Sequence, residues 1–271
     1  MNRIRLFGNT PLVVKNLIII NVIMLLATMF LADRIDLVNL LGMHFYKSNH
    51  FGPWQLITHM FMHANFLHLA LNMYALWMFG QTLEYDWGSK RFLFYYLVTG
   101  MGAVLFNMLV QYFDLSHLSH IIDNYAQHPN FSSFIEIVNK YVPVPNRSDS
   151  ANEFITKFSA GANDPGIISN SISFLREYFT EVMDTPLVGA SGAVFGVLLA
   201  FGMLHPNTEL MFIFPPMPVK AKWVVLGYGA VELYSGVQQP GSNIAHFAHL
   251  GGMIFGFLLI KYWQANRKTF Y

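Results

Sequence analysis

The chain contains no cysteine among its 271 residues, and it carries few charged side chains. The absence of cysteine excludes a disulfide framework, a thiolate metal site and a cysteine nucleophile. Lysine, arginine, aspartate and glutamate make up only 11% of the residues, whereas soluble domains carry about 25%. The formal net charge of +1 provides no basic surface of the kind that binds nucleic acid. We therefore expect a protein that uses no nucleic-acid partner, no cofactor and no metal ion.

Apolar side chains are abundant instead and make up 54% of the chain. The hydrocarbon core of a bilayer is about 30 Å thick and takes roughly 20 apolar residues per helix. Six segments meet this requirement, so the sequence predicts an all-α membrane protein built as a bundle of six transmembrane helices. The predicted spans are residues 12–32, 56–83, 92–113, 188–205, 220–237 and 243–263.

Lysine and arginine predict the orientation, because short cytoplasmic loops carry an excess of these residues. Ten of the 16 fall on one side of the predicted bundle: Arg3, Arg5, Lys15, Lys90, Arg91, Lys220, Lys222, Lys261, Arg267 and Lys268. Both termini are therefore expected in the cytoplasm, with the first span retained rather than cleaved. The predicted location is a multi-pass protein of the bacterial plasma membrane.

Residues 114–187 are too polar to span a bilayer, and they are interrupted by Pro129, Pro143, Pro145 and Pro165. Two apolar stripes at helical spacing predict short amphipathic helices in this segment. Their members are Phe131, Phe134, Ile135, Val138 and Val142 in one stripe, and Ile168, Ile172, Leu175, Phe179 and Met183 in the other. The topology predicts a large outer-face insertion between the third and fourth spans, which lies either on the membrane surface or on the helical bundle.

One serine stands among glycine and alanine in the segment VGASGAVFG, residues 188–196. Pro186 lies just upstream, so we predict a helix that begins near residues 187–190 with Ser191 in its first turn. The unpaired N–H groups there, including that of Ser191, would stabilise an oxyanion beside the hydroxyl. Taken alone, these small residues suit the contact between two packed membrane helices equally well.

Polar side chains inside predicted spans are functional candidates, because each costs free energy to place in hydrocarbon. His68 and Asn72 are four residues apart and share one face of the second span. His246 and His249 lie in the sixth span. No acidic residue is placed in the sequence to orient His249, so the pattern predicts a Ser–His dyad in which the imidazole takes the proton of Ser191.

Other interpretations of these residues are weaker. His59 and His63 are four residues apart but lack the glutamate of an H-E-x-x-H zinc protease. Glu84 and Glu232 are interpreted as carboxylates that cap or extend past helix ends. A channel or metal transporter that uses the histidines of the second span would need a polar face through several spans, and the third and fifth lack one.

Taken together, these residues resemble the motifs of the rhomboid family of intramembrane serine proteases. The matching motifs are Gly189-x-Ser191-Gly192 in the fourth span, His249-x-x-Gly252-x-x-x-Gly256 in the sixth and His68-x-x-x-Asn72 in the second. Only His249 has glycines three and seven residues later, which favours it over His246 as the base. The close helix approach that Gly252 and Gly256 permit would bring His249 near Ser191. The resemblance covers nearly all of the chain outside residues 114–187.

The resemblance implies a rhomboid-like bundle that cleaves transmembrane segments of membrane-protein substrates, with His68, Asn72 and the Ser191 backbone as oxyanion donors. Substrates would enter between the second and fifth spans, with residues 238–243 as a movable cap. Gln55 departs from the family pattern, which commonly has arginine after Trp54, and Phe195 stands where many members have a tyrosine that packs on the catalytic ring. The alternative is a catalytically silent relative that binds membrane clients, and the presence of both Ser191 and His249 favours the protease.

Overall fold

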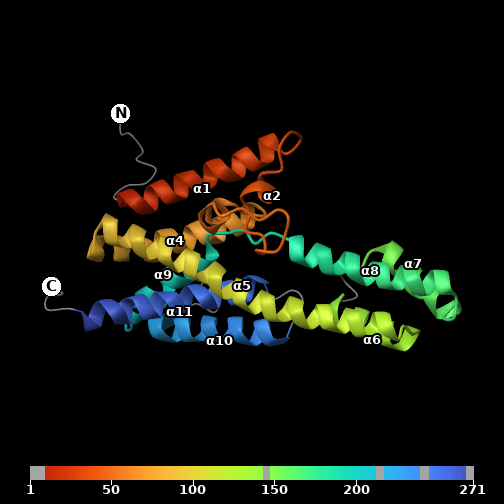
Figure 1. Cartoon of the computed structure of the whole chain (residues 1–271). Helices are drawn as coiled ribbons and strands as arrows, with labels where there is room; N and C mark the ends of the chain where they lie inside the picture. The colour runs from red at the N-terminus through yellow and green to blue at the C-terminus, as the bar shows by residue number, and fades with distance from the viewer. Residues whose placement is uncertain (1–9, 143–146, 212–216, 239–243, 267–271) are drawn as a thin grey trace.

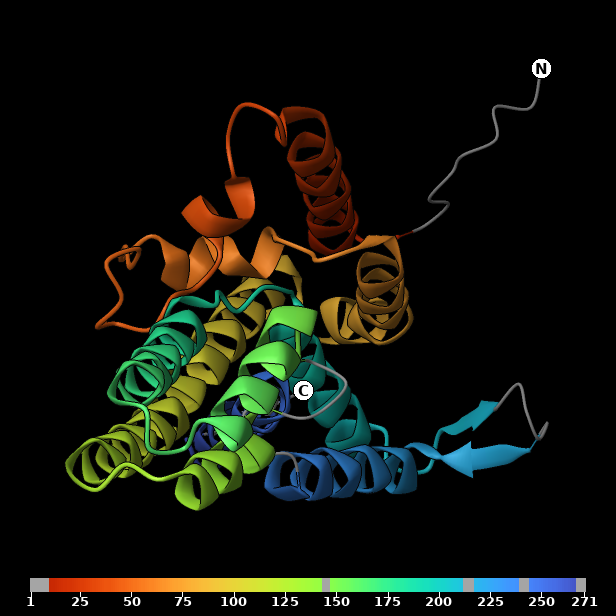
Figure 2. The same ribbon diagram turned by 90° about the vertical axis from the view of Figure 1, so that its right-hand side faces the viewer.

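The computed structural model of the chain describes residues 10–142, 147–211, 217–238 and 244–266 and is mostly helical (Figure 1). The larger helices are α1 (Leu12–Leu31), α4 (Phe66–Trp87), α5 (Ser89–Gln127), α6 (Phe131–Tyr141), α7 (Asp149–Ala160), α8 (Pro165–Asp184), α9 (Ser191–Leu204), α10 (Ala221–Gln238) and α11 (Ile244–Ala265). The short helical turns are α2 (Leu37–Leu41), α3 (Gln55–Thr58) and η1 (His59–Phe61). The strands β1 (Glu209–Met211) and β2 (Pro218–Lys220) form an antiparallel pair with Glu209 opposite Lys220. This pair projects away from the helices (Figure 2).

Helix α9 occupies the centre of the bundle, where α4, α5, α10 and α11 all pack against it. Its sequence is apolar on every side, which is typical of a helix surrounded by others. Small residues let these neighbours approach closely, since Gly196 lies against Thr99 of α5 and Gly202 against Val225 of α10. The main apolar core of the protein forms around this helix.

Helix α1 is fixed to the bundle by a carboxylate rather than by packing alone. The backbone N–H groups of Val13 and Val14 donate to the two oxygens of Glu84 at 2.9 and 2.8 Å. These N–H groups belong to the first turn of α1, which has no acceptors within the helix. Ser89 also donates to Glu84 Oε1 at 2.6 Å. Glu84 of α4 thus caps a different helix and links three elements.

The predicted second span, residues 56–83, differs from the structure. The chain forms α3 and η1, turns, and begins α4 only at Phe66. Asn65 ends the turn because its side chain accepts the N–H of His68 at 2.8 Å, as an N-cap residue does. The ranges predicted for the first, fifth and sixth spans differ from α1, α10 and α11 by one or two residues.

The predicted boundary of the insertion at residue 114 falls inside a continuous helix. Helix α5 is 39 residues long and ends at Gln127, two residues before Pro129. No proline lies between its ends, so nothing in the backbone stops it at the predicted end of the third span. The end of α5 packs with α6, α7 and α8 into a second apolar core, which we call the α6–α8 cluster.

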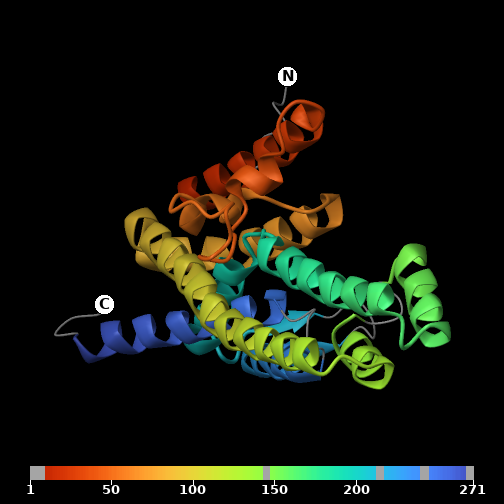
Figure 3. The same cartoon turned by 45° about the vertical axis from the view of Figure 1, so that its right-hand side comes forward.

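The α6–α8 cluster lies at the end of the bundle opposite to the one where α1 begins and α11 ends (Figures 1 and 3). Both predicted apolar stripes pack into its core, where Phe134, Val138 and Leu175 are fully buried. Met183 instead lines a small cavity with Phe45. The stripes are therefore covered within the cluster, together with apolar residues of α5 and α7, rather than left exposed.

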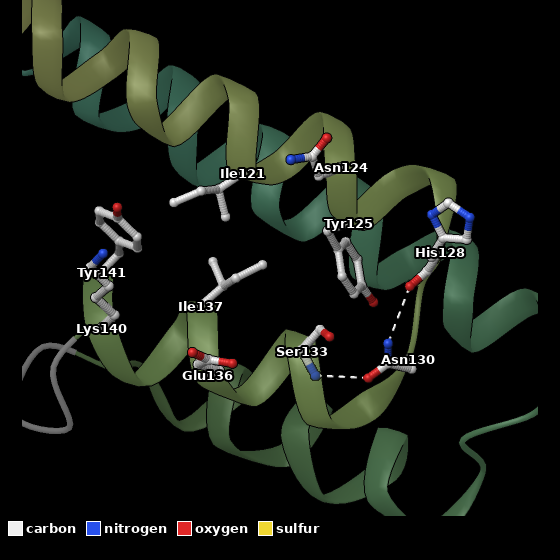
Figure 4. A pocket seen from close by; sticks show the side chains of 10 residues that line it. All are labelled: Ile121, Asn124, Tyr125, His128, Asn130, Ser133, Glu136, Ile137, Lys140 and Tyr141. Carbon is white, nitrogen blue, oxygen red and sulfur yellow. Dashed lines mark hydrogen bonds between the residues drawn. The ribbon is translucent and has the colours of Figure 1, made fainter.

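A cavity of about 380 Å³ lies between the end of α5 and α6 (Figure 4). Its lining is mixed, with Ile121 and Ile137 beside Glu136 and Lys140. Asn130 borders it and caps α6, since its side chain accepts the N–H of Ser133 at 2.8 Å. None of the sequence-predicted site residues lines this cavity.

Among the residues that the structure describes, α1 and α5 are by themselves long and apolar enough to cross a membrane, while α9 is apolar but shorter. The number of spans therefore stays a prediction.

Candidate functional site

Ser191 is the first residue of α9, at the point where an extended segment turns into the helix. Two contacts hold that segment. Leu187 pairs with Met43 through reciprocal backbone hydrogen bonds of 2.8 Å, and the N–H of Gly189 donates to the carbonyl of His59 at 3.0 Å. Ser191 is therefore positioned from both sides, by a fixed strand-like segment before it and by the central helix after it.

Gly189 has a backbone conformation that other residues rarely adopt, with φ of 126°. A Cβ atom at this position would lie 2.8 Å from Cε1 of His68 and 3.6 Å from the hydroxyl oxygen of Ser191. The His68 ring and the Ser191 hydroxyl thus border the same glycine. Gly189 is needed both for the turn into α9 and for the space that His68 occupies.

Asn72 is buried on the same face of α4 as His68. Its side-chain amide donates to the carbonyl of His68 at 2.9 Å, one turn earlier in the helix. No hydrogen bond joins Asn72 to Ser191 in the described part of the chain. The structure therefore brings His68 beside Ser191, whereas Asn72 contacts the backbone of its own helix.

The closest approach of two backbones at the site is that of α9 and α11. A Cβ atom on Gly252 would lie 1.9 Å from the carbonyl oxygen of Gly192, and one on Gly192 would lie 2.4 Å from Cβ of Ala103. Gly256, one turn later, lies against Tyr95, which donates to the carbonyl of Gly196 at 2.8 Å. Gly252 thus packs on α9 and Gly256 on α5, so the two glycines contact different helices.

His249 lies one turn before Gly252, and its ring stacks on Phe195 with centroids 4.2 Å apart and planes 6° apart. Phe195 is four residues after Ser191 and therefore on the same face of α9. The structure thus brings His68 of α4 beside Ser191 and His249 of α11 against the next turn of α9, and no hydrogen bond joins Ser191 to His249 among the described residues.

Glu232 of α10 lies against both histidines of α11, which sequence analysis did not predict. Its Oε2 atom is 2.6 Å from Nδ1 of His246, and its Oε1 atom is 3.1 Å from Nδ1 of His249. The Glu232 side chain is only 12% exposed. Glu232 stands six residues before the end of α10, so its interpretation as a helix-end carboxylate was wrong.

Glu232, His246 and His249 are also residue types that bind metal ions, and they lie close enough together to share one. Their ligand atoms lie within 4.8 Å of one another, as nitrogen and oxygen ligands of a zinc ion do. His59 and His63 belong to no such group among the residues that the structure describes. His59 instead contacts the carbonyl of Gln55 at 2.7 Å, which gives no support to a zinc protease motif in this segment.

Gln55, which stands where the rhomboid family commonly has arginine, forms hydrogen bonds to backbone groups of the loop that precedes the site. Its side chain is 1% exposed and accepts the N–H groups of His44 and Gly52 at 3.2 and 3.1 Å. Its amide nitrogen also lies 2.9 Å from the carbonyl oxygen of His50. Trp54 donates to Leu40 at 3.0 Å. A neutral amide, with both donors and acceptors, satisfies backbone groups on both sides of this loop.

The predicted cap at residues 238–243 lies, apart from Gln238, outside the described residues.

Most of the chain, including these motifs, matches one known protein family. Residues 50–119 and 158–265 match the family model described as the rhomboid domain. The unmatched residues 120–157 hold the end of α5, all of α6 and most of α7.

Individual relatives show the same similarity. An uncharacterized mitochondrial rhomboid protein of Schizosaccharomyces pombe is 29% identical over 227 residues, which cover 80% of this chain and 53% of the relative. Mitochondrial rhomboid protein 1 of Saccharomyces cerevisiae is 24% identical over 198 residues, or 73% of this chain and 38% of the relative. The rhomboid protease AarA of Providencia stuartii is 34% identical over 79 residues, or 29% of this chain and 28% of the relative. The chain thus spans about half the length, or less, of these relatives.

Proposed function

The chain belongs to the rhomboid family, and on this premise we propose that it is an intramembrane serine endopeptidase with Ser191 as nucleophile and His249 as general base. The observation that carries the proposal is the stack of His249 on Phe195, one turn from Ser191 on the same face of α9. Relatives that are named as proteases support a protease as the class of enzyme.

The proposed reaction begins when His249 takes the hydroxyl proton of Ser191 while the serine oxygen attacks a peptide carbonyl. His249 then gives this proton to the leaving amine as the C–N bond breaks, which leaves an acyl-enzyme. Water, deprotonated by His249, hydrolyses the ester and restores Ser191. His249 passes on each proton that it takes up, first from Ser191 to the leaving amine and then from water to the oxygen of Ser191, so both steps balance.

The negative charge on the carbonyl oxygen needs donors at the moment of attack. The N–H of Ser191 is at the first position of α9, where helix N–H groups have no acceptor within the helix. The ring of His68 borders Gly189 beside the serine hydroxyl and is the side-chain donor we propose. Asn72 joins it through the amide hydrogen that the bond to His68 leaves free. Donors of this kind act through preorganisation, since they are in position before charge develops.

The apolar surface of the bundle supports membrane proteins as the substrates. The family implies an integral membrane protein, and large apolar side chains are exposed on α1, α4 and α10, including Phe30, Phe66 and Val237. Exposed apolar surface of this extent is unfavourable in water and favourable in hydrocarbon. We propose that α1, α4, α5, α9, α10 and α11 are the six spans, with the α6–α8 cluster on the outer face. Transmembrane segments of other proteins are then the substrates.

The bacterial plasma membrane and the cytoplasmic termini remain predictions. The two relatives aligned over most of the chain are mitochondrial by name, and they do not support a bacterial location.

The decisive experiment uses the purified full chain in detergent. A fluorophosphonate probe should label the protein at Ser191, and a transmembrane reporter should be cleaved. Ser191→Ala should abolish both while the thermal unfolding temperature is unchanged, and His249→Ala should lose about as much activity, because residues that act as a unit are not additive. His246→Ala should lose less. Retained labelling in Ser191→Ala would refute Ser191 as the nucleophile. A wild type that is neither labelled nor able to cleave the reporter would support the client-binding alternative.

A further inference from the structure

The carboxylate of Glu232 stands between two imidazoles in the interior of the bundle. It bridges Nδ1 of His246 at 2.6 Å and Nδ1 of His249 at 3.1 Å. The two histidines come from α11, whereas Glu232 comes from the neighbouring α10, which runs beside it (Figure 1). Both Nδ1 atoms thus contact one side chain.

The nitrogen Nδ1 of His249 is buried and forms no well-directed hydrogen bond within the described residues. Glu232 Oε1 lies 3.1 Å from it, which is within hydrogen-bond distance. A buried N–H without an acceptor is costly, which makes the carboxylate the group that satisfies it. The stack on Phe195 leaves the His249 ring free to turn within its own plane, and such a turn would direct Nδ1–H at Oε1.

The protonation pattern follows from the chemistry of the three groups. An ionised carboxylate only accepts hydrogen bonds, so each Nδ1 that contacts it must carry its hydrogen. In a neutral imidazole the other nitrogen, Nε2, then holds the free lone pair. The lone pair on Nε2 of His249 is what a general base needs in order to take a proton from serine.

We propose that Glu232 is a positioning residue for His249: it fixes the Nδ1–H tautomer and stabilises the imidazolium that forms when Ser191 is deprotonated. This inference rests on the proposed function, and it replaces the predicted dyad by a serine–histidine–glutamate arrangement drawn from three helices. Glu232 touches neither substrate nor the reacting oxygen and acts only through His249.

His246 has the second role in this arrangement. Its Nδ1 lies 2.6 Å from Oε2, closer than Nδ1 of His249 lies to Oε1, and it therefore holds the other oxygen of the carboxylate. Ligands that share a metal ion at about 2.0–2.2 Å are kept farther apart than this. The 2.6 Å separation is that of a charge-assisted hydrogen bond, which favours the positioning role over a metal site.

The first test compares Glu232→Gln with Glu84→Gln. Both glutamates are buried in the bundle and both have polar contacts to a neighbouring helix, but Glu84 accepts backbone N–H groups of α1, whereas Glu232 contacts two histidines of α11. For the transmembrane reporter, Glu232→Gln should lower kcat by about 10²–10⁴, the loss seen when the orienting acid of a triad becomes an amide, with KM little changed. Glu84→Gln should lower the unfolding temperature and leave kcat of the folded protein as in the wild type.

Glu232→Asp separates charge from shape. Aspartate keeps the negative charge but places the carboxylate one methylene farther from the His249 ring. The kcat of Glu232→Asp should therefore be at least tenfold higher than that of Glu232→Gln. If Glu232→Gln does not fold, Glu232→Asp alone decides: it should lie below the wild type in kcat and match it in KM. A wild-type kcat in either folded variant would overturn the proposal, as would an equal loss in Glu84→Gln.

A second measurement does not depend on activity. In ¹⁵N-histidine-labelled wild type, with the His249 signals assigned by their absence from His249→Ala, we expect hydrogen on Nδ1 and none on Nε2. Hydrogen on Nε2 would overturn the proposal even in a protein that cleaves nothing, and an inactive wild type with the expected tautomer would refute only the proposed function. Stoichiometric zinc in the purified protein that is lost in Glu232→Gln would show a metal site instead.

Discussion

Phe195 lies flat against the imidazole of His249, with ring centroids 4.2 Å apart and planes 6° apart. The stack restricts tilting of the imidazole out of its plane. Tyr228 of α10 meets Phe195 edge-on, with ring centroids 6.2 Å apart. A phenyl ring provides this contact without the hydroxyl of a tyrosine. The plane of the proposed base is therefore set from α9, the helix that also carries Ser191.

Phe195→Ala should lower kcat for reporter cleavage, because the His249 ring loses its stacking partner. A stack of this kind contributes about 0.5–1.5 kcal/mol, which corresponds to a loss of roughly 2–12-fold if all of it positions the base. Phe195→Tyr keeps the ring and should retain nearly full activity. Steady-state kinetics of the two variants check this, and equal activity of Phe195→Ala and the wild type would mean that the stack only fills space.

His68 and Asn72 should differ in their effect on acylation. His68→Ala removes a side chain that borders the serine hydroxyl, so the labelling rate of Ser191 should fall by about 10²–10³, as for other oxyanion donors. Asn72→Ala should cost less, since its amide also donates to the His68 carbonyl. Rates of covalent probe labelling distinguish these outcomes. If neither substitution slows labelling, both residues only pack helices.

Gly252→Ala should separate α9 from α11 and inactivate the protein. The added methyl group would lie 1.9 Å from the carbonyl oxygen of Gly192, and a backbone atom cannot move aside as a flexible side chain can. Gly227→Ala in α10 is the matched control, because a Cβ there meets nothing within 4 Å. The control should keep activity and unfold at or slightly above the wild-type temperature. Similar unfolding temperatures for the two variants would contradict the close contact.

Glu84→Ala should destabilise the attachment of α1 without touching the site. It leaves the N–H groups of Val13 and Val14 without acceptors, and hydrogen bonds to a charged group contribute about 1.5–3 kcal/mol each. We expect a lower unfolding temperature in detergent, with normal probe labelling at temperatures where the protein remains folded. An unchanged unfolding temperature would show that α1 is held by apolar packing alone.

Replacement of residues 118–182 by a short Gly/Ser linker tests what the α6–α8 cluster does. The segment before Ser191 is held by Met43 and His59, which lie outside the cluster. A small soluble serine probe should therefore label Ser191 nearly as in the wild type. We expect the cleavage rate or cleavage site of a transmembrane substrate to change, because the cluster extends from the end of the bundle that leads into α9 (Figure 3). Unaltered cleavage would leave the cluster a surface anchor only.

The α6–α8 cluster also contains a buried polar contact between Tyr125 and Ser171. Ser171 donates to the carbonyl of Ile168 at 2.7 Å, so the Tyr125 hydroxyl is the donor in the bond that joins it to Ser171. Burial raises the pKa of Tyr125, which keeps this phenol protonated. The bond thus joins α5 to α8 inside the second core.

Local chemistry in the sequence determined much of this protein. Apolar segments of spanning length predicted α1, α10 and α11 to within two residues, because helix limits there follow from composition along the chain. The glycine–serine segment predicted a helix that begins near residues 187–190 with Ser191 in its first turn, and α9 begins at Ser191 itself. The G-x-x-x-G spacing predicted a close approach, which Gly252 makes to α9. Membership of the rhomboid family was likewise predicted from short motifs, and the family match confirms it.

Tertiary structure alone decided which polar side chains meet. Glu232 and His249 are 17 residues apart on different helices, so no spacing rule relates them, and their contact exists only because α10 packs beside α11. Glu84 is likewise linked to Val13 and Val14 across about 70 residues. The continuation of α5 into a second core depends on partners that come later in the chain. Sequence periodicity shows which residues share a face of one helix. The hydrogen-bond partners of a buried charged side chain instead come from the helix that packs against it, which only the tertiary structure determines.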